Sequence, residues 1–165
     1  AEQPTAQSTA TVTRNADKAT LTFNLSSPPA GTSYGQNRLI IASPTYQQLP
    51  SRLFPQDKTN FLPGETVALA YQYGTGSPIE SSTGTFVVFS GAASQVTVGN
   101  LDPTQEYYFF IFDYNDDNLA RAENYITPNN PTQPPLPVSL LSFSARLTGS
   151  QVALRWTTAS ELNNK

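Results

Sequence analysis

The stretch that decides the fold reads Val96-Thr-Val-Gly-Asn-Leu-Asp-Pro-Thr-Gln-Glu-Tyr-Tyr-Phe-Phe-Ile-Phe112. Its first residues alternate between apolar and polar, which is typical of a half-buried strand. Leu101, Pro103 and Tyr107 then mark a corner that leads into an aromatic strand. In a β-sandwich, the tyrosine of such a corner packs in the core while its hydroxyl bonds the backbone of the corner. We therefore expect Tyr107 to be buried, with its hydroxyl bonded near residues 100–103.

Short strand patterns surround this corner, and helical periodicity is almost absent. Leu21, Phe23 and Leu25, for example, alternate with polar residues and predict a half-buried strand. Strands are predicted at residues 8–14, 20–25, 38–42, 86–89, 95–98, 107–114 and 124–127, with a further hairpin around residues 65–73. Many short strands separated by turn residues predict an all-β, antiparallel β-sandwich.

The sequence predicts three parts along the chain. Residues 1–128 form the sandwich, which carries a long, proline-interrupted insertion at residues 43–82. Prolines are frequent in residues 129–137, which predicts a stiff, extended linker. Residues 138–165 then hold two strand patterns, 138–147 and 152–156, joined by Thr148-Gly149-Ser150 as a β-hairpin.

Composition excludes several function classes. The 165 residues carry a net charge of -3 and include only nine Lys and Arg, which are scattered, so nothing predicts nucleic-acid binding. His and Cys are both absent, which excludes His-based triads, cysteine proteases and zinc sites built on these residues. No apolar run approaches the roughly 18 residues that span a bilayer. The 12 acidic residues include no pair placed for glycoside hydrolysis, so we expect no enzyme activity, no catalytic residue and no bound organic cofactor.

One motif points to a metal ion. Asp113, Asn115 and Asp117 have the spacing that opens a calcium-binding loop, in which alternate side chains present oxygen ligands. The motif departs from that loop where Asn118 stands in place of Gly and Asn124 in place of Glu. The alternative is a solvated turn, which Asp and Asn favour.

The aromatic strand is apolar on both faces, which is unusual in an antiparallel sandwich. Tyr108, Phe110 and Phe112 take the face opposite to that of Tyr107. Something must cover this outer face, since an apolar patch of that size is a sticky surface. The insertion, the hairpin that follows the linker, and a neighbouring molecule are the candidates.

The insertion carries aromatic side chains with two possible roles. They are Tyr46, Phe54, Phe61, Tyr71 and Tyr73. Exposed rings would stack on sugars, whereas packed rings would form a satellite core under the long loop. A loop of this length needs packing to be ordered, which favours the satellite core.

The C-terminal hairpin needs a surface, because an isolated hairpin is marginally stable in water. Val152, Leu154 and Trp156 are the residues expected to be buried there. The hairpin either docks on its own sandwich or adds strands to the sheet edge of a neighbour. The second arrangement is open-ended and would build a filament or sheath.

Residues 8–127 resemble the fibronectin type III-like domain of bacterial exported proteins that use type IX secretion. The resemblance rests on residues 37–42, 55–59, 74–76, 85–91, 101–115 and 124–126. Lys58 departs from the family, which usually has Gly in a Pro-x-Asp-Gly-Thr segment, so the local turn is in doubt. Residues 136–145 and 152–161 look like the first two strands of a second sandwich domain that often precedes a sorting signal of that system.

The resemblance implies a fibronectin type III or immunoglobulin-like sandwich at an extracellular or cell-surface location. The function expected from it is a non-catalytic structural or adhesive module, with self-assembly into a cell-surface filament or sheath as one form. Its expected partners are other copies of the chain or adjoining domains. The alternatives are a carbohydrate-binding module with a glycan partner, and an accessory domain of a larger exported hydrolase.

Overall fold

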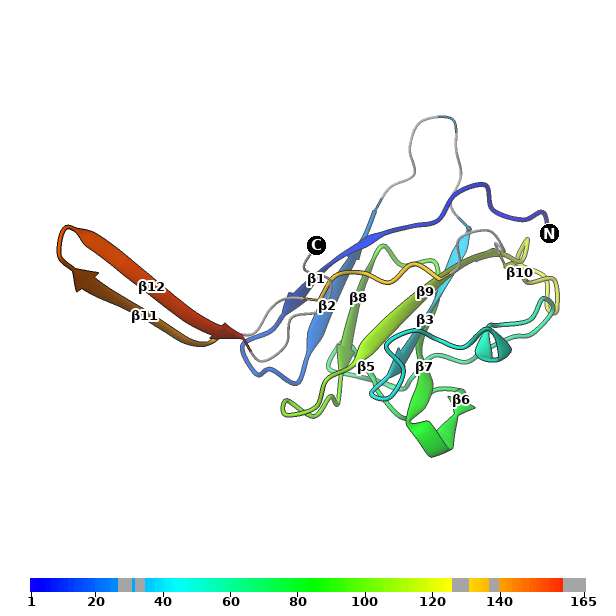
Figure 1. Cartoon of the computed structure of the whole chain (residues 1–165). Coiled ribbons are helices and arrows are strands. Elements are labelled where there is room, and N and C mark those ends of the chain that lie inside the picture. The colour runs from blue at the N-terminus through cyan, green and yellow to red at the C-terminus, as the bar shows by residue number, and fades with distance from the viewer. Residues whose placement is uncertain (27–30, 32–34, 126–130, 137–139, 159–165) are drawn as a thin grey trace. The chain divides into compact units, whose positions relative to one another are not determined.

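The computed structural model describes residues 1–26, 31, 35–125, 131–136 and 140–158 (Figure 1). The chain divides into two compact units, residues 1–134 and residues 135–165. Strands dominate both units, and the helical elements assigned in the described part are two single 3-10 turns, η1 (Ser51–Leu53) and η2 (Ser81–Thr83). The prediction of an all-β, antiparallel, sandwich-like fold is therefore confirmed.

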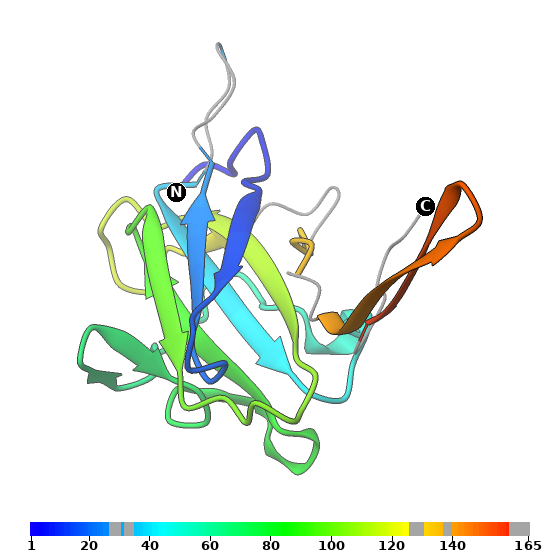
Figure 2. The same ribbon diagram turned by 90° about the vertical axis from the view of Figure 1, so that its left-hand side faces the viewer.

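Two five-stranded sheets form the described part of unit 1 (Figures 1 and 2). Sheet A has the order β1 (Ala10–Arg14), β2 (Leu21–Leu25), β8 (Gln95–Gly99), β5 (Ala70–Gln72) and β4 (Thr66–Val67). Sheet B has the order β10 (Asn124–Tyr125), β9 (Tyr108–Asn115), β3 (Asn37–Ser43), β7 (Thr85–Gly91) and β6 (Pro78–Glu80). Neighbouring strands pair antiparallel, except that β5 runs parallel to β8.

The two sheets pack face to face through aromatic contacts. Phe23 of β2 meets Phe109 of β9 edge-on, with ring centroids 4.8 Å apart. Tyr71 of β5 meets Phe89 of β7 in the same way, at 5.2 Å. Side chains from both sheets are buried in this layer because alternate residues of each strand point inward.

The insertion at residues 43–82 is part of the sandwich, because it contributes strands to both sheets. It supplies β4 and β5 to one edge of sheet A, and β6 to one edge of sheet B. The two-residue turn between β4 and β5 consists of Ala68 and Leu69, both at positive φ (48° and 67°). The hairpin expected around residues 65–73 is therefore present, although Asn and Gly are the usual residues of such a turn.

Two expectations about unit 1 change. The stretch 131–134 was predicted to belong to a stiff, extended linker, and Thr132 within it exchanges two backbone hydrogen bonds with Ile111 of β9 (2.8 and 3.0 Å). Gln133 also donates to the carbonyl of Gln47, so this stretch lines the sandwich. Strand β6 was not predicted, because a three-residue strand that begins with proline carries almost no periodic signal.

Unit 2 is described as a single antiparallel hairpin. Strands β11 (Leu140–Thr148) and β12 (Gln151–Thr158) pair from Thr148 opposite Gln151 to Leu140 opposite Thr158. Gly149 supplies the positive φ (64°) that the tight turn requires. The remaining predicted positions of this region, 137–139 and 159–165, lie outside the described residues.

Candidate functional site

The predicted corner is present, with one correction. The backbone N–H of Asp102 donates to the Tyr107 hydroxyl (3.1 Å), Leu101 is buried, and Pro103 is exposed. Tyr107 itself is half-buried, whereas full burial was expected. It stands one residue before β9, at the end of the sandwich, where its ring meets the edge of Tyr73 (5.0 Å).

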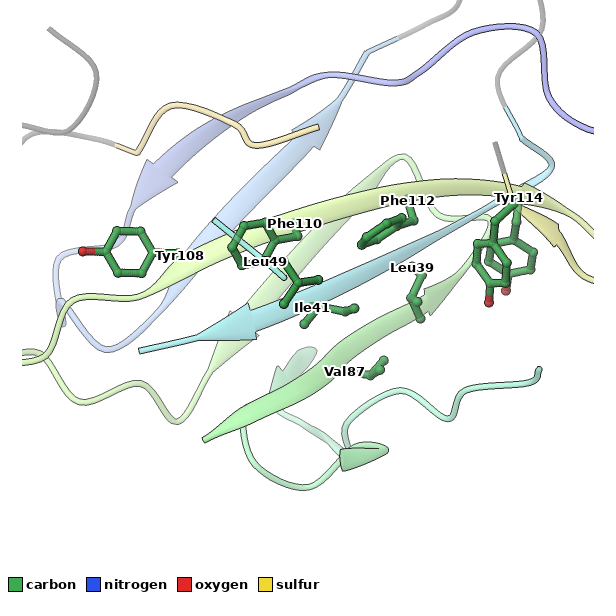
Figure 3. Packing of buried hydrophobic residues seen from close by; sticks show 9 residues of the cluster. Leu39, Ile41, Leu49, Val87, Tyr108, Phe110, Phe112 and Tyr114 are labelled. Atoms are coloured by element: carbon green, nitrogen blue, oxygen red, sulfur yellow. The ribbon is translucent and has the colours of Figure 1, made fainter. Parts of the chain in front are cut away.

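The outer face of sheet B is covered within the chain. Tyr108, Phe110 and Phe112 are 6%, 1% and 1% exposed. Together with Leu39, Ile41, Leu49, Val87, Tyr114 and Tyr125 they form one apolar cluster, which we call the outer core (Figure 3). Residues of the insertion lie over it: Leu49 belongs to the cluster, and Tyr46, Leu53, Phe54, Phe61 and Ile79 pack against it.

The aromatic side chains of the insertion pack against the strands of sheet B. Phe54 meets the edge of Phe112 at 5.3 Å, and Tyr73 meets the edge of Phe86 at 5.8 Å. The five rings considered for sugar stacking are each half-buried. Tyr46, Phe54 and Phe61 pack against the outer core as a satellite core, whereas Tyr71 packs between the two sheets. Burial raises the pKa of Tyr73 to about 12, with Tyr107 adding to the effect.

A polar cluster joins the first part of the insertion to strand β6 at the edge of sheet B. The Glu80 carboxylate accepts hydrogen bonds from Arg52 (2.7 Å) and from the hydroxyls of Tyr46 (2.6 Å) and Thr83 (2.9 Å). Arg52 also donates to the Tyr46 hydroxyl (3.0 Å). The hydrogen bond from Arg52, followed by those from Tyr46 and Thr83, lowers the pKa of Glu80 to about 2.

The three residues considered for calcium each have a different partner within the chain. Asp113 is fully buried on β9, accepts from the N–H and hydroxyl of Ser8 (2.7 and 2.8 Å), and lies 3.4 Å from Arg38 Nε. Burial raises the pKa of Asp113, while the hydrogen bonds from Ser8 oppose that effect. The carboxylate thus fastens the N-terminal segment to sheet B.

The other two members of the motif belong to a turn. Asn115 accepts from the N–H of Gln36 (2.7 Å), and Asp117 lies 3.4 Å from the amino group of Ala1. Asp117 and Asn118 both have positive φ (51° and 57°), the turn conformation that Asp and Asn tolerate. Within the described stretches of the chain, no three or more His, Cys, Asp or Glu side chains are grouped to hold a metal ion.

The hairpin of unit 2 has two chemically different faces. Cross-strand pairs Phe143–Trp156, Ala145–Leu154 and Leu147–Val152 share one face, which we call the apolar face. The other face carries Ser144 opposite Arg155, Arg146 opposite Ala153, and Thr148 opposite Gln151. Charge is thus confined to one face of the hairpin.

The apolar face is exposed. Phe143, Leu147, Val152, Leu154 and Trp156 are each 54–71% exposed. Burial of Val152, Leu154 and Trp156 was expected, and the two strands of the hairpin by themselves leave these side chains exposed. Phe143 and Leu147 were not among the predicted residues, although their alternation with Ser144 and Arg146 carried the same signal as that of β12.

A second exposed apolar spot lies at the tip of the β4–β5 hairpin. Leu69 is 89% exposed and Val67 is 57% exposed. Leu69 holds a positive φ, which costs a non-glycine residue about 1–2 kcal/mol. This spot is much smaller than the apolar face of the hairpin in unit 2.

Comparison with known proteins supplies no match: none of the family models, the curated proteins or the solved structures matches this chain. Among the residues described, no helix has the length and apolar character that a membrane span requires.

Proposed function

We propose that the chain is a non-catalytic, extracellular structural or adhesive module and that the β11–β12 hairpin is its contact surface. The observation that carries the proposal is the apolar face, on which five large side chains are each more than half exposed. An exposed apolar patch of this kind is typical of a surface that binds another protein. The partner we expect is another copy of the chain or an adjoining domain.

Unit 1 supports this function as a scaffold. Two of its carboxylates take part in structural contacts: Asp113 holds the N-terminal segment, and Glu80 on β6 holds Arg52 and Tyr46. The insertion closes its outer core, so this apolar surface of sheet B is already covered. Because the outer face of sheet B is covered and the apolar face of the hairpin is exposed, we assign partner binding to the hairpin.

The extracellular setting rests on the sequence. Residues 8–127 resemble the fibronectin type III-like domain of exported bacterial proteins, which implies a cell-surface location and the type IX route. The low share of charged residues, 13%, and the absence of Cys agree with a surface rich in Thr, Ser, Asn and Gln and a fold without disulfides.

Carbohydrate binding remains the second candidate, and one observation favours it. Phe143 and Trp156 are neighbours across the hairpin and are 60% and 58% exposed. Two adjacent exposed rings provide a platform on which a sugar ring can stack. A pull-down on insoluble polysaccharide separates the two candidates, because retention that Trp156→Ala abolishes would favour the glycan.

Removal of the hairpin tests the proposed function. A variant that ends at Pro135 keeps the compact unit 1 and lacks β11 and β12. We expect it to fold, to stay monomeric and to lose the self-association or surface adhesion of the full chain. Equal association and adhesion by both proteins would contradict the proposal, and thermal unfolding of the variant checks that unit 1 remains folded.

A further inference from the structure

The apolar face of the hairpin consists of three rows of different size. The first row pairs Phe143 with Trp156, the middle row pairs Ala145 with Leu154, and the last pairs Leu147 with Val152. The rows therefore run from the bulkiest pair at one end to a smaller aliphatic pair at the other. None of the six side chains is charged.

A hairpin of this kind is not expected to stand alone. Two strands are marginally stable in water, and a third strand or a packed face is needed for independent stability. The exposed side chains are also hydrophobic enough to drive association, since each buried Val or Leu contributes roughly 1.5–3 kcal/mol. The apolar face needs an apolar cover.

We infer that this cover is the same face of a second copy of the chain, so that two hairpins stack into a four-stranded, two-layer sandwich. The inference rests on the proposed function and names its partner. It commits to face-to-face packing, in contrast to the addition of strands along a sheet edge.

The order of the rows makes the face self-complementary. A twofold axis across the strands at the middle row would lay the Phe143–Trp156 row of each copy over the Leu147–Val152 row of the other. Trp156 would face Val152, and Phe143 would face Leu147. Large residues would thus lie over smaller ones at both ends, which keeps the layer near the 10 Å thickness of packed sheets.

The available area agrees with a specific pair. With 54–71% of five large side chains exposed, each copy offers apolar surface on the order of 500 Å². Two copies would bury about 1,000 Å², the size at which specific protein interfaces begin. A weak, concentration-dependent dimer is therefore expected.

The charges also permit this pairing. Arg146 and Arg155 lie on the face opposite to the apolar one, so stacking places them on the two outer surfaces of the sandwich. They are then separated by the thickness of both sheets, and their repulsion is largely screened at physiological salt. Such a pair is isologous and closes at two copies.

Two alanines provide a matched test in the full chain. Ala145 lies in the middle row of the apolar face, and Ala153 lies on the opposite face beside Arg146. Light scattering and sedimentation from about 1 µM to about 1 mM should show the wild-type chain and Ala153→Arg moving from monomer to twice the monomer mass. Ala145→Arg should remain a monomer throughout.

Cysteine cross-linking tests the geometry without adding charge. The chain has no cysteine of its own, and the twofold axis brings the two copies of residue 145 together. With a short bis-maleimide, Ala145→Cys should form a covalent dimer and Ala153→Cys should not. Equal cross-linking of the two variants would overturn the pairing.

The remaining outcomes separate the inference from the proposed function. Oligomers larger than two that persist in Ala145→Arg but vanish in the variant ending at Pro135 would overturn face-to-face pairing and keep the hairpin as the contact surface. A wild-type chain that stays monomeric at every concentration would overturn the pair. Adhesion of that monomer, lost on removal of the hairpin, would still support the proposed function with a different partner.

Discussion

The outer face of sheet B and the apolar face of the β11–β12 hairpin are both rich in large apolar side chains, but the first is buried and the second is exposed. Both are apolar surfaces of antiparallel strands, yet Phe112 on β9 is 1% exposed whereas Trp156 on β12 is 58% exposed. The insertion covers the first surface with Leu49 and Phe54. The outer face of sheet B is thus closed by a segment of unit 1 itself, whereas the two strands of the hairpin provide no cover for their own apolar face.

The largest expected effect is a difference in the free energy of unfolding between alanine variants of the two surfaces. Phe112→Ala removes a buried ring from the outer core and should lower the free energy of unfolding by about 3–5 kcal/mol. Trp156→Ala removes an exposed ring and should change it by less than about 0.5 kcal/mol in dilute protein. Chemical denaturation of both variants measures the difference, and similar losses would erase the contrast between the surfaces.

Low pH should weaken the hydrogen bonds of Glu80 in the insertion and should not affect the hairpin. The folded-state pKa of Glu80 is lowered to about 2 from an ordinary value of 4.5, so its contribution to stability is present above pH 4.5 and is lost as the pH falls toward 2. Glu80→Gln should reduce the loss of stability between pH 4.5 and pH 2. Denaturation across that range measures it, and an unchanged pH dependence would show that the cluster around Glu80 does not fasten the insertion.

The hydrogen bond at the corner before β9 should contribute modestly to the free energy of unfolding. Tyr107→Phe removes the acceptor for the Asp102 N–H and should cost about 0.5–1.5 kcal/mol. Because Tyr107 is half-buried and water can reach part of its ring, we expect the cost of this substitution to lie near the lower end of that range. A loss as large as that of Phe112→Ala would mean that the corner, and not the outer core, fixes β9.

The smallest expected effect is a gain in stability at the tip of the insertion. Leu69 is exposed and holds a positive φ of 67°, which glycine adopts without strain. Leu69→Gly should therefore stabilise the chain by up to about 1 kcal/mol. Thermal unfolding measures the change, and a loss of stability would show that the Leu69 side chain contributes more to the folded β4–β5 hairpin than its positive φ costs.

The sequence predicts the sandwich well where periodicity is strong. The alternation of Leu21, Phe23 and Leu25 appears in full as β2, and the two-sided aromatic run from Tyr108 appears as β9. The need for a cover on that outer face also followed from the pattern. The identity of the cover did not, because the insertion packs through scattered residues such as Leu49 and Phe61 without a repeating spacing.

Other features escaped prediction for physical reasons. Asp113, Asn115 and Asp117 have the spacing of a metal loop, and only tertiary contacts with Ser8, Gln36 and Ala1 reveal their use. The bridge between Thr132 and Ile111 joins residues far apart in sequence within a proline-rich stretch, where no periodic signal exists. The alternation of apolar and polar residues along β11 and β12 was visible in the sequence. That pattern does not tell which molecule or segment packs against the apolar face, so the burial of this face could not be predicted.

Fluorescence of Trp156 tests the central contrast most directly, because it is the one tryptophan of the chain and lies on the apolar face. We expect red-shifted emission and strong acrylamide quenching in dilute protein, with a blue shift and weaker quenching as the concentration rises. Ala145→Arg should abolish that change, and Ala153→Arg should retain it. Emission that is blue-shifted and protected from quenching at every dilution would show that the apolar face is covered within the same chain, which would overturn the proposed pairing of two hairpins.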